Sequence, residues 1–229
     1  MKHIRILSLS LILLAAFAGL SSCEDSDQKT LSNAQACLDQ ANSKTAANAC
    51  VAQLGTLRSA EAYSIICSAH FIAQGFTTTR FVSAYNALSA SGTGTNPTAA
   101  ALAVMSFDAT TGTDGSTQTF TDCKASNVQS LIQLSVLAQM ATLIGSTIPG
   151  GQPATGYTPA QIATAIASYS GDPTALGNTA ITAGQVYCAA GSSYTTSSVC
   201  TTLNAAIGSN TNPAAIGTAL LAQLQIANP

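Results

Sequence analysis

Six cysteines between residues 37 and 200 constrain the fold of this chain more than any other feature. A seventh, Cys23, precedes them, and the six are Cys37, Cys50, Cys67, Cys123, Cys188 and Cys200. No two are spaced as in a Cys-x-x-Cys metal cluster or a haem-attachment motif. An even number of well-separated cysteines is typical of disulfides formed in an oxidising compartment. The sequence therefore predicts three disulfides if the chain is exported.

The spacing of these cysteines favours one pairing and leaves others open. Cys37 and Cys50 enclose a short stretch, and Cys188 and Cys200 enclose one of similar length. Each spacing suits a bridge that clamps two antiparallel helices at their shared turn, which leaves Cys67 for Cys123. Six cysteines allow many connectivities, so this pairing is one hypothesis among them. A short loop closed in this way contributes about 3 kcal/mol in the chain-entropy description, and less if the bridge is strained.

Residues 1–22 have the order of an export signal. Lys2 and Arg5 form a basic start, residues 6–20 are apolar, and Ser21 and Ser22 stand directly before Cys23. This is the order of a cleaved signal peptide. The apolar run is shorter than the roughly 20 residues that span a bilayer as a helix, which disfavours a permanent transmembrane anchor.

Leu20-Ser21-Ser22-Cys23 resembles the lipobox of bacterial lipoproteins, in which an aliphatic residue and two small residues precede a cysteine. The resemblance implies cleavage before Cys23, diacylglycerol on its sulfur and an acyl chain such as palmitate on the new amino terminus. Two or three acyl chains hold a protein on a membrane without a spanning helix. Residues 23–29 are then a polar tether. In such lipoproteins an aspartate directly after the lipid-bearing cysteine favours retention in the inner membrane. This chain has Glu24 at that position, which implies the outer membrane. The competing interpretation is an ordinary secretory signal that ends by chance at a cysteine.

The composition argues against binding to nucleic acid. Charged residues make up only 7% of the chain and hydrophobic residues 47%. A typical soluble domain has about 25% charged residues, so uncharged polar side chains must cover much of this surface. The Lys and Arg residues beyond the signal are scattered, whereas nucleic acids require aligned cations. These residues are Lys29, Lys44, Arg58, Arg80 and Lys124.

From Thr30 onward apolar residues recur at three- and four-residue spacing, and no segment alternates as a strand does. We therefore expect residues 30–229 to form an all-α, disulfide-stabilised bundle of about seven to ten short helices. A capping residue followed by proline predicts helix starts at Pro97, Pro159, Pro173 and Pro213. Residues 76–88 are expected to be helical, 107–120 a loop, and 121–144 one apolar helix at the centre. The connector around 145–158 is the predicted meeting point of two helical halves.

Few residues offer chemistry. His70 is the one histidine after the signal, and it follows Cys67 by three residues on the same helix face. The pair suits a metal site or a thiol with its base, but a bridged Cys67 beside an amphipathic His70 is the stronger interpretation. Asp108, Asp114 and Asp122 lack the spacing of an EF-hand calcium loop. We expect no catalytic, cofactor or metal site.

The tyrosines are the remaining recognition candidates. Tyr63 and Tyr85 are expected to complete the core. Tyr157 and Tyr194 stand in loop-like sequence and are left open as surface residues.

Two functions compete. The first is a lipid-anchored cell-envelope or cell-surface lipoprotein with a structural or interaction role, whose partners are the membrane and an envelope or surface protein. It is expected not to be an enzyme and to show no deep polar pocket. The alternative is a module that holds a small apolar or glycan ligand between helices, which predicts a sizeable cavity lined by Leu, Ile, Phe and Tyr. An enzyme would need His70 in a cleft with an acid and a hydroxyl or thiol nearby.

Overall fold

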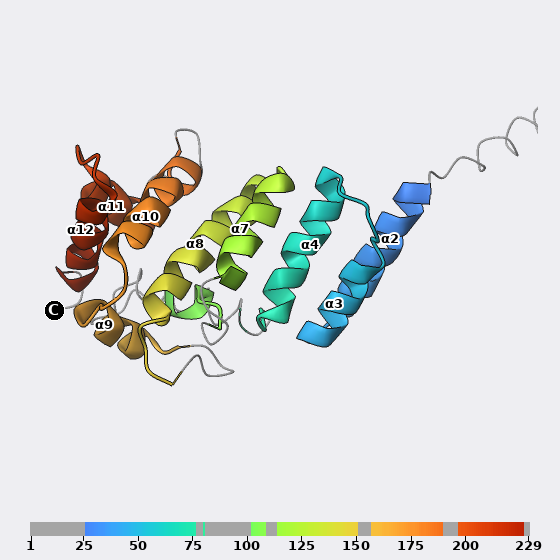
Figure 1. The fold of residues 1–229 in the computed structure, drawn as a ribbon, viewed down its shortest axis with the longest axis horizontal. Coiled ribbons are helices and arrows are strands. Elements are labelled where there is room, and N and C mark those ends of the chain that lie inside the picture. The colour runs from blue at the N-terminus through green and yellow to red at the C-terminus, as the bar shows by residue number, and fades with distance from the viewer. Residues whose placement is uncertain are drawn as a thin grey trace, which may run out of the picture.

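The structure of the chain, a computed structural model, describes residues 26–76, 80, 102–108, 114–150, 157–189 and 197–226. Within these ranges every regular element is helical and no strand occurs (Figure 1). The predicted all-α, disulfide-stabilised helical bundle is confirmed. The signal peptide, Cys23, the start at Pro97 and most of the helix predicted over 76–88 lie outside the described residues.

The helices follow one another along the length of the molecule. The N-terminal group is α2 (Ser26–Leu38), α3 (Lys44–Ala52) and α4 (Ala60–Ala73). The central pair is α7 (Asp114–Ala125) and α8 (Gln129–Gly145), with α9 (Pro159–Ala167) near the carboxyl end of α8. The last group is α10 (Pro173–Tyr187), α11 (Ser198–Ile207) and α12 (Pro213–Ile226). Figure 1 shows the N-terminal group at one end of the long axis and α10, α11 and α12 at the other.

The helix starts follow from local capping chemistry. Thr158 accepts a hydrogen bond from the Gln161 amide in a capping box that precedes Pro159. Asp172 caps α10 through the Thr174 amide, and Asn212 accepts a hydrogen bond from the Ala214 amide at the start of α12. Each side chain satisfies an amide that has no partner inside its helix. The predicted helix starts at Pro159, Pro173 and Pro213 are therefore confirmed.

The single helix predicted over 121–144 is wrong. The chain breaks at 126–128, where Asn127 has a φ of 57°. Asparagine tolerates this left-handed conformation better than most residues. The Ser126 hydroxyl donates to the Cys123 carbonyl and accepts from the Val128 amide, so the break satisfies its own polar groups. The helix that follows, α8, packs against α4, α7, α9 and α10 and holds the predicted central position.

Two further boundaries differ from expectation. The loop predicted over 107–120 is wrong from residue 114 onward, because α7 begins at Asp114. The polar tether predicted over 23–29 overlaps α2, which begins at Ser26. The Thr30 hydroxyl donates to the Ser26 carbonyl, as in a first helical turn. Only Glu24 and Asp25 separate α2 from Cys23.

Two hydrophobic clusters fill the interior. The smaller lies between α2, α3 and α4 and consists of Ala34, Leu38, Ala47, Cys50, Leu54, Ala62, Ile65, Ile66 and Ala69. The larger begins at Cys67 and Phe71 and continues to Leu224. Ile144 and Ile162, on either side of the connector around 145–158, both belong to the larger cluster. α4 contributes residues to both clusters, so the boundary between the two clusters lies at this helix.

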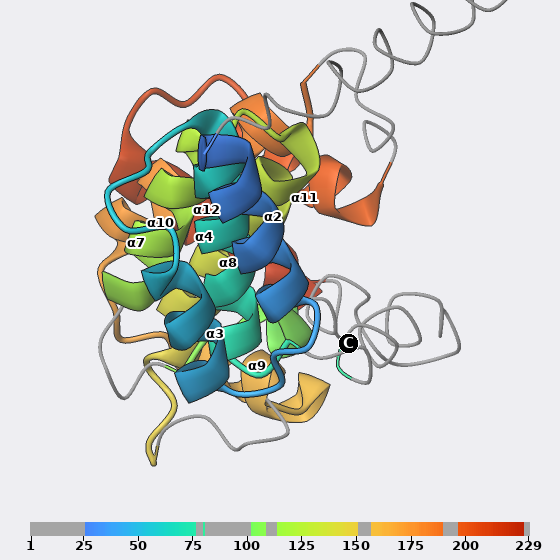
Figure 2. The ribbon, with the colours of Figure 1, turned by 90° about the vertical axis from the view of Figure 1, so that its right-hand side faces the viewer.

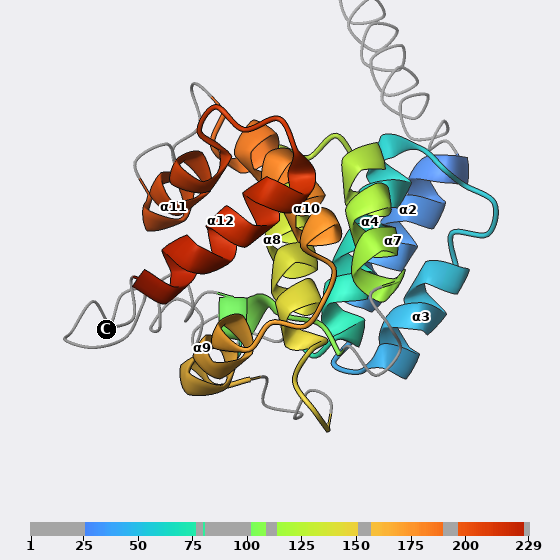
Figure 3. The ribbon, with the colours of Figure 1, turned by 60° about the vertical axis from the view of Figure 1, so that its left-hand side comes forward.

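The closest helix contact joins α10 to α12, which cross at Gly177 and Gly217 (Figure 3). A Cβ atom at Gly177 would overlap the Pro213 carbonyl, and one at Gly217 would overlap the Pro173 carbonyl. Both helices start with proline and have glycine four residues later. The absence of side chains at these two positions lets the backbones touch.

Candidate functional site

All six cysteines from Cys37 onward are in disulfides, and the predicted pairing is confirmed: Cys37 with Cys50, Cys67 with Cys123, and Cys188 with Cys200. The Cys188–Cys200 bridge joins the end of α10 to the first turn of α11, at their connection as expected. The Cys37–Cys50 bridge differs, because it joins the last turns of α2 and α3 instead of their shared turn. Disulfides of this kind form in oxidising, extracytoplasmic compartments.

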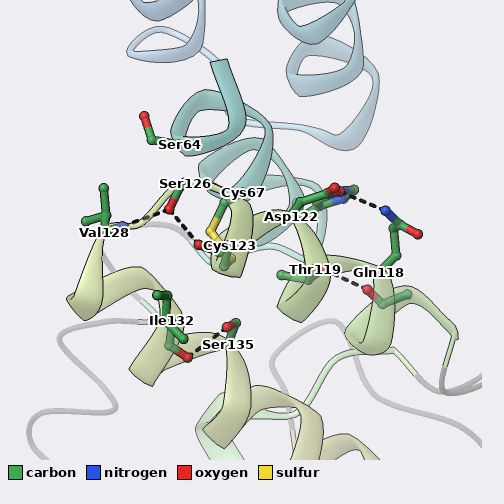
Figure 4. Close-up of a disulfide and its surroundings, with 12 residues drawn as sticks. Ser64, Cys67, Gln118, Thr119, Asp122, Cys123, Ser126, Val128, Ile132 and Ser135 are labelled. Carbon is green, nitrogen blue, oxygen red and sulfur yellow. Dashed lines mark hydrogen bonds and ion pairs between the residues drawn. A yellow bond between two sulfur atoms is a disulfide. The ribbon is translucent and has the colours of Figure 1, made fainter. Parts of the chain in front are cut away.

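The Cys67–Cys123 bridge joins α4 to α7 and has a polar cluster beside it (Figure 4). His70 Nε2 lies 2.8 Å from Asp122 Oδ2, and Gln118 Nε2 donates to the same oxygen at 3.1 Å. His70 stands one turn after Cys67, and Asp122 directly precedes Cys123, so the ion pair and the bridge link the same two helices. The side chains of His70 and Asp122 are 34% and 11% exposed. We call Cys67, His70, Gln118, Asp122 and Cys123 the α4–α7 cluster.

The α4–α7 cluster differs from the candidate that the sequence offered. The Cys67 sulfur is bonded to Cys123, so no thiol is available to pair with His70 as its base. The stronger interpretation of Cys67 is confirmed, and the amphipathic His70 beside it also pairs with Asp122. Asp122 is far from His70 in the sequence, and no local motif pointed to it. The arrangement joins two helices by a covalent bond and an ion pair.

The buried face of α7 is polar. Ser116 and Thr119 are each 1% exposed, Cys123 follows on the same face, and buried Ser126 lies in the turn directly after the helix. The Thr119 hydroxyl donates to the Gly115 carbonyl and the Ser126 hydroxyl to the Cys123 carbonyl. Within the described part of the chain, every buried side-chain nitrogen and oxygen has a hydrogen-bond partner. This face therefore gives α7 a fully bonded packing surface against α4 and α8.

A second buried polar group, Arg80, fixes the end of α4 to residues 102–108. Arg80 is 8% exposed. Its guanidinium donates to the carbonyls of Gln74 at 2.6 Å, Ser106 at 2.6 Å and Val104 at 3.0 Å. It also lies 4.1 Å from the centroid of the Phe76 ring, within cation–π range. Burial lowers the pKa of Arg80 to about 10, which leaves it charged at neutral pH. Arg80 is thus a structural clamp.

Two pockets in the described part of the chain differ from the sizeable cavity, lined by Leu, Ile, Phe and Tyr, that the ligand-binding alternative predicts. An interior pocket of about 10 Å³ lies between apolar residues of the larger cluster, among them Met140, Leu203 and Leu224. A space of this size holds one water molecule at most. A larger groove of about 270 Å³ separates the end of α8 from α9. Its lining is uncharged and consists of Thr147, Ile148, Pro149, Ala160, Gln161, Thr164, Ala165 and Ser168. We call it the α8–α9 groove, and His70 lines neither space.

Tyr157, for which the sequence did not decide between a core and a surface position, belongs to the core. Tyr157 is 4% exposed and its hydroxyl donates to the Gly145 carbonyl at 3.1 Å. Burial raises the pKa of Tyr157 above its ordinary value. Tyr63 packs against the smaller hydrophobic cluster, as predicted. Tyr85 and Tyr194 lie outside the described residues.

The acidic residues do not form a cluster suited to a metal ion in the described part of the chain. In the ranges that the structure describes, no three His, Cys, Asp or Glu side chains gather as a metal site would require. Asp122 pairs with His70, and the Asp108 amide donates to the Gln74 side chain.

Comparison of the chain with protein-family models, with curated proteins and with solved structures gave no match. A role for this protein is therefore inferred from the geometry of the residues described above and from the sequence of residues 1–23. Among the described helices, none combines the length and the apolar character that crossing a membrane requires.

Proposed function

We propose that this protein is a lipid-anchored lipoprotein of the bacterial cell envelope or cell surface, held in the outer membrane through Cys23, with a structural or interaction role. The observation that carries the proposal is that six of the seven cysteines are bonded in pairs, which leaves Cys23. Six are bonded to one another in the folded domain, and the seventh ends the Leu20-Ser21-Ser22-Cys23 sequence. A bond from Cys23 to any of the six would require breaking an existing bridge.

The α4–α7 cluster supports a structural role over a catalytic one. Its sulfur atoms are bonded to each other, and the His70 side chain is paired with the Asp122 carboxylate. Covalent bridges in each third of the domain suit a protein that must survive outside the cytoplasm, where few systems refold it.

Metabolic labelling tests the anchor. The full chain would be expressed in a bacterial host that processes lipoproteins and grown with an alkyne analogue of palmitate. We expect label on the native chain and none on a Cys23→Ser variant, with the native chain in the outer-membrane fraction of a density gradient. A native chain without label would overturn the anchor. Label with the protein in the inner membrane would overturn the outer-membrane assignment alone.

A second candidate function is the binding of a small glycan in the α8–α9 groove. The observation in its favour is the mixed lining, in which hydroxyl and amide groups of Thr147, Gln161 and Thr164 stand beside aliphatic Ile148 and Ala165. Such a lining offers donors and acceptors to sugar hydroxyls and apolar contact to the ring. Titration of soluble cell-wall glycan fragments, followed by calorimetry, tests it. A Thr164→Val variant should lose the heat of binding if the groove is the site, and no heat with the native protein would exclude these fragments as ligands.

A further inference from the structure

We propose that one end of the bundle rests on the membrane surface, namely the end formed by the starts of α2, α4 and α8 and the turn between α7 and α8. The partner is the layer of lipid headgroups around the anchor. This inference rests on the proposed lipid at Cys23 and adds the orientation of the domain on the membrane.

The short connection between Cys23 and α2 sets the distance from the membrane. α2 begins at Ser26, three residues after Cys23. An extended chain spans at most about 3.6 Å per residue, so Ser26 lies within roughly 11 Å of the lipid-bearing residue whatever path the connection takes. The headgroup layer on each side of a bilayer is itself about 5–8 Å thick. The first turn of α2 is therefore held at the surface of the headgroups.

The first turn of α2 shares its end of the bundle with three other segments. Figures 1, 2 and 3 all show the start of α2 at the same end as the start of α4 and the turn between α7 and α8. α8 contains 17 residues, which gives it a length of about 25 Å. It therefore carries the chain from this end to the opposite one, where α9 and the α8–α9 groove lie (Figure 2). The groove then faces away from the membrane.

An apolar side chain stands at the proposed contact. Val128, in the turn between α7 and α8, is 39% exposed. In the described part of the chain it is the one large hydrophobic residue exposed to this extent. An apolar side chain at the headgroup layer leaves water and favours contact with the membrane. The short connection after Cys23 would also permit the outer faces of α2 and α3 to lie against the membrane. The exposed Val128 favours the end of the bundle that contains the turn between α7 and α8 instead.

The charges at this end nearly balance. Exposed Lys29, Arg58 and Lys124 are accompanied by exposed Asp27 and Glu61. Attraction to anionic lipid requires a cluster of several unopposed cations. The contact should therefore form on uncharged phosphatidylcholine and persist at high salt.

Quenching of tryptophan by brominated lipid tests the orientation. The chain contains no tryptophan, so each single substitution introduces the one tryptophan, whose emission is separate from that of the six tyrosines. The full chain would carry Val128→Trp at the proposed contact, Asn48→Trp on the exposed face of α3, or Ala167→Trp at the end of α9. Each variant would be made in a host that lipidates it and reconstituted in phosphatidylcholine vesicles with and without brominated chains. Intact mass would establish the acyl chains beforehand.

We expect brominated lipid to reduce the fluorescence of the Val128→Trp variant and to leave the other two nearly unchanged. A flexible Gly-Ser insertion of about 12 residues before Ser26 adds roughly 20 Å of reach and should reduce the quenching at position 128. Equal or stronger quenching at position 48 or 167, or none at 128 in an acylated protein, would overturn the orientation. A mass without acyl chains would overturn the proposed function and, with it, this inference.

Discussion

Gly177 and Gly217 face each other where α10 crosses α12, and each lies against the carbonyl of the proline that starts the other helix. A Cβ atom at Gly177 would also come within 3.0 Å of the Gly217 amide nitrogen, and one at Gly217 within 3.1 Å of the Gly177 amide nitrogen. The relationship is reciprocal, because the two helices use the same Pro-x-x-x-Gly spacing. The atoms that would be displaced are backbone atoms, which cannot move aside as a flexible side chain can.

Replacing either glycine with alanine should destabilise the fold. Alanine gains up to about 1 kcal/mol of helix preference. Overpacking lowers the free energy of unfolding by about 1–3 kcal/mol. We expect a loss at the upper end of this range here, because the two helices must separate to make room for a Cβ atom. We expect a net loss of about 2 kcal/mol for Gly177→Ala and for Gly217→Ala in urea unfolding. The double variant should lose less than the sum, because both changes open the same contact.

Gly115→Ala is the matched control for these glycines. It lies in the first turn of α7, and the nearest atom to a new Cβ is 3.9 Å away. We expect no loss and a gain of up to about 1 kcal/mol. A loss at position 115 equal to that at position 177 would contradict the crossing as the cause.

The three disulfides should differ in their contribution to stability. The Cys67–Cys123 bridge closes a separation of 56 residues, whereas the others close 13 and 12. In the chain-entropy description, a longer loop is worth about 4 kcal/mol and the shorter ones about 3 kcal/mol each. Paired Cys→Ala variants, compared by urea unfolding, should therefore rank the Cys67–Cys123 pair as the most costly. An equal or smaller loss for this pair would contradict the ranking.

A thiol count checks that all six cysteines are bridged. The mature protein, unfolded in denaturant without reductant, should react with no thiol reagent at the six bridged positions. After reduction all six should react. Two or more labelled thiols before reduction would contradict the three-disulfide structure, and peptide mapping would identify the open pair.

The ion pair between His70 and Asp122 should contribute modestly. The His70 side chain is about a third exposed, so water and salt screen the interaction. A cycle of His70→Gln, Asp122→Asn and the double variant should give a coupling of about 1 kcal/mol. Lys124→Gln, an exposed change in the same helix, should alter the stability by less than about 0.5 kcal/mol. A coupling near zero would show that the His70–Asp122 pair adds nothing to the bridge and the packing between α4 and α7.

Arg80 should be far more costly to replace than an exposed arginine. Arg80→Met keeps much of the length and leaves three carbonyls without their charged donor. An unsatisfied buried group costs about 1–3 kcal/mol, so we expect a loss of about 3 kcal/mol or more by urea unfolding. Arg58→Met is the control, since Arg58 is exposed and its bonds reach only nearby carbonyls of its own turn. Equal losses at the two sites would contradict the clamp.

Much of the fold could be predicted because its signals are local. A capping side chain followed by proline marks the start of α9, α10 and α12, and the structure begins these helices at Pro159, Pro173 and Pro213. The spacing of the cysteines favoured the pairing that the structure contains. The caps and the two short bridges join residues that are close in the sequence, and the distant Cys67–Cys123 pair is what the two short bridges leave over.

The start of α7 could not be found in the same way. A helix is predicted from apolar residues at helical spacing, but α7 buries the polar residues Ser116 and Thr119 on its inner face. The break after α7 was also hidden, because Asn127 forms it and no glycine or proline in residues 121–130 marks the end of a helix. The pairing of His70 with Asp122 and the contacts of Arg80 depend on residues far apart in the chain, which no local pattern reports.

The bridge between Cys67 and Cys123 also makes residues 67–123 a covalent ring. A protease that cuts one peptide bond between these residues opens the ring and releases no fragment, since the two pieces stay joined through sulfur. Two cuts within the ring are needed before any mass is lost. The chain can thus be cut once in this region and still remain one covalently joined molecule.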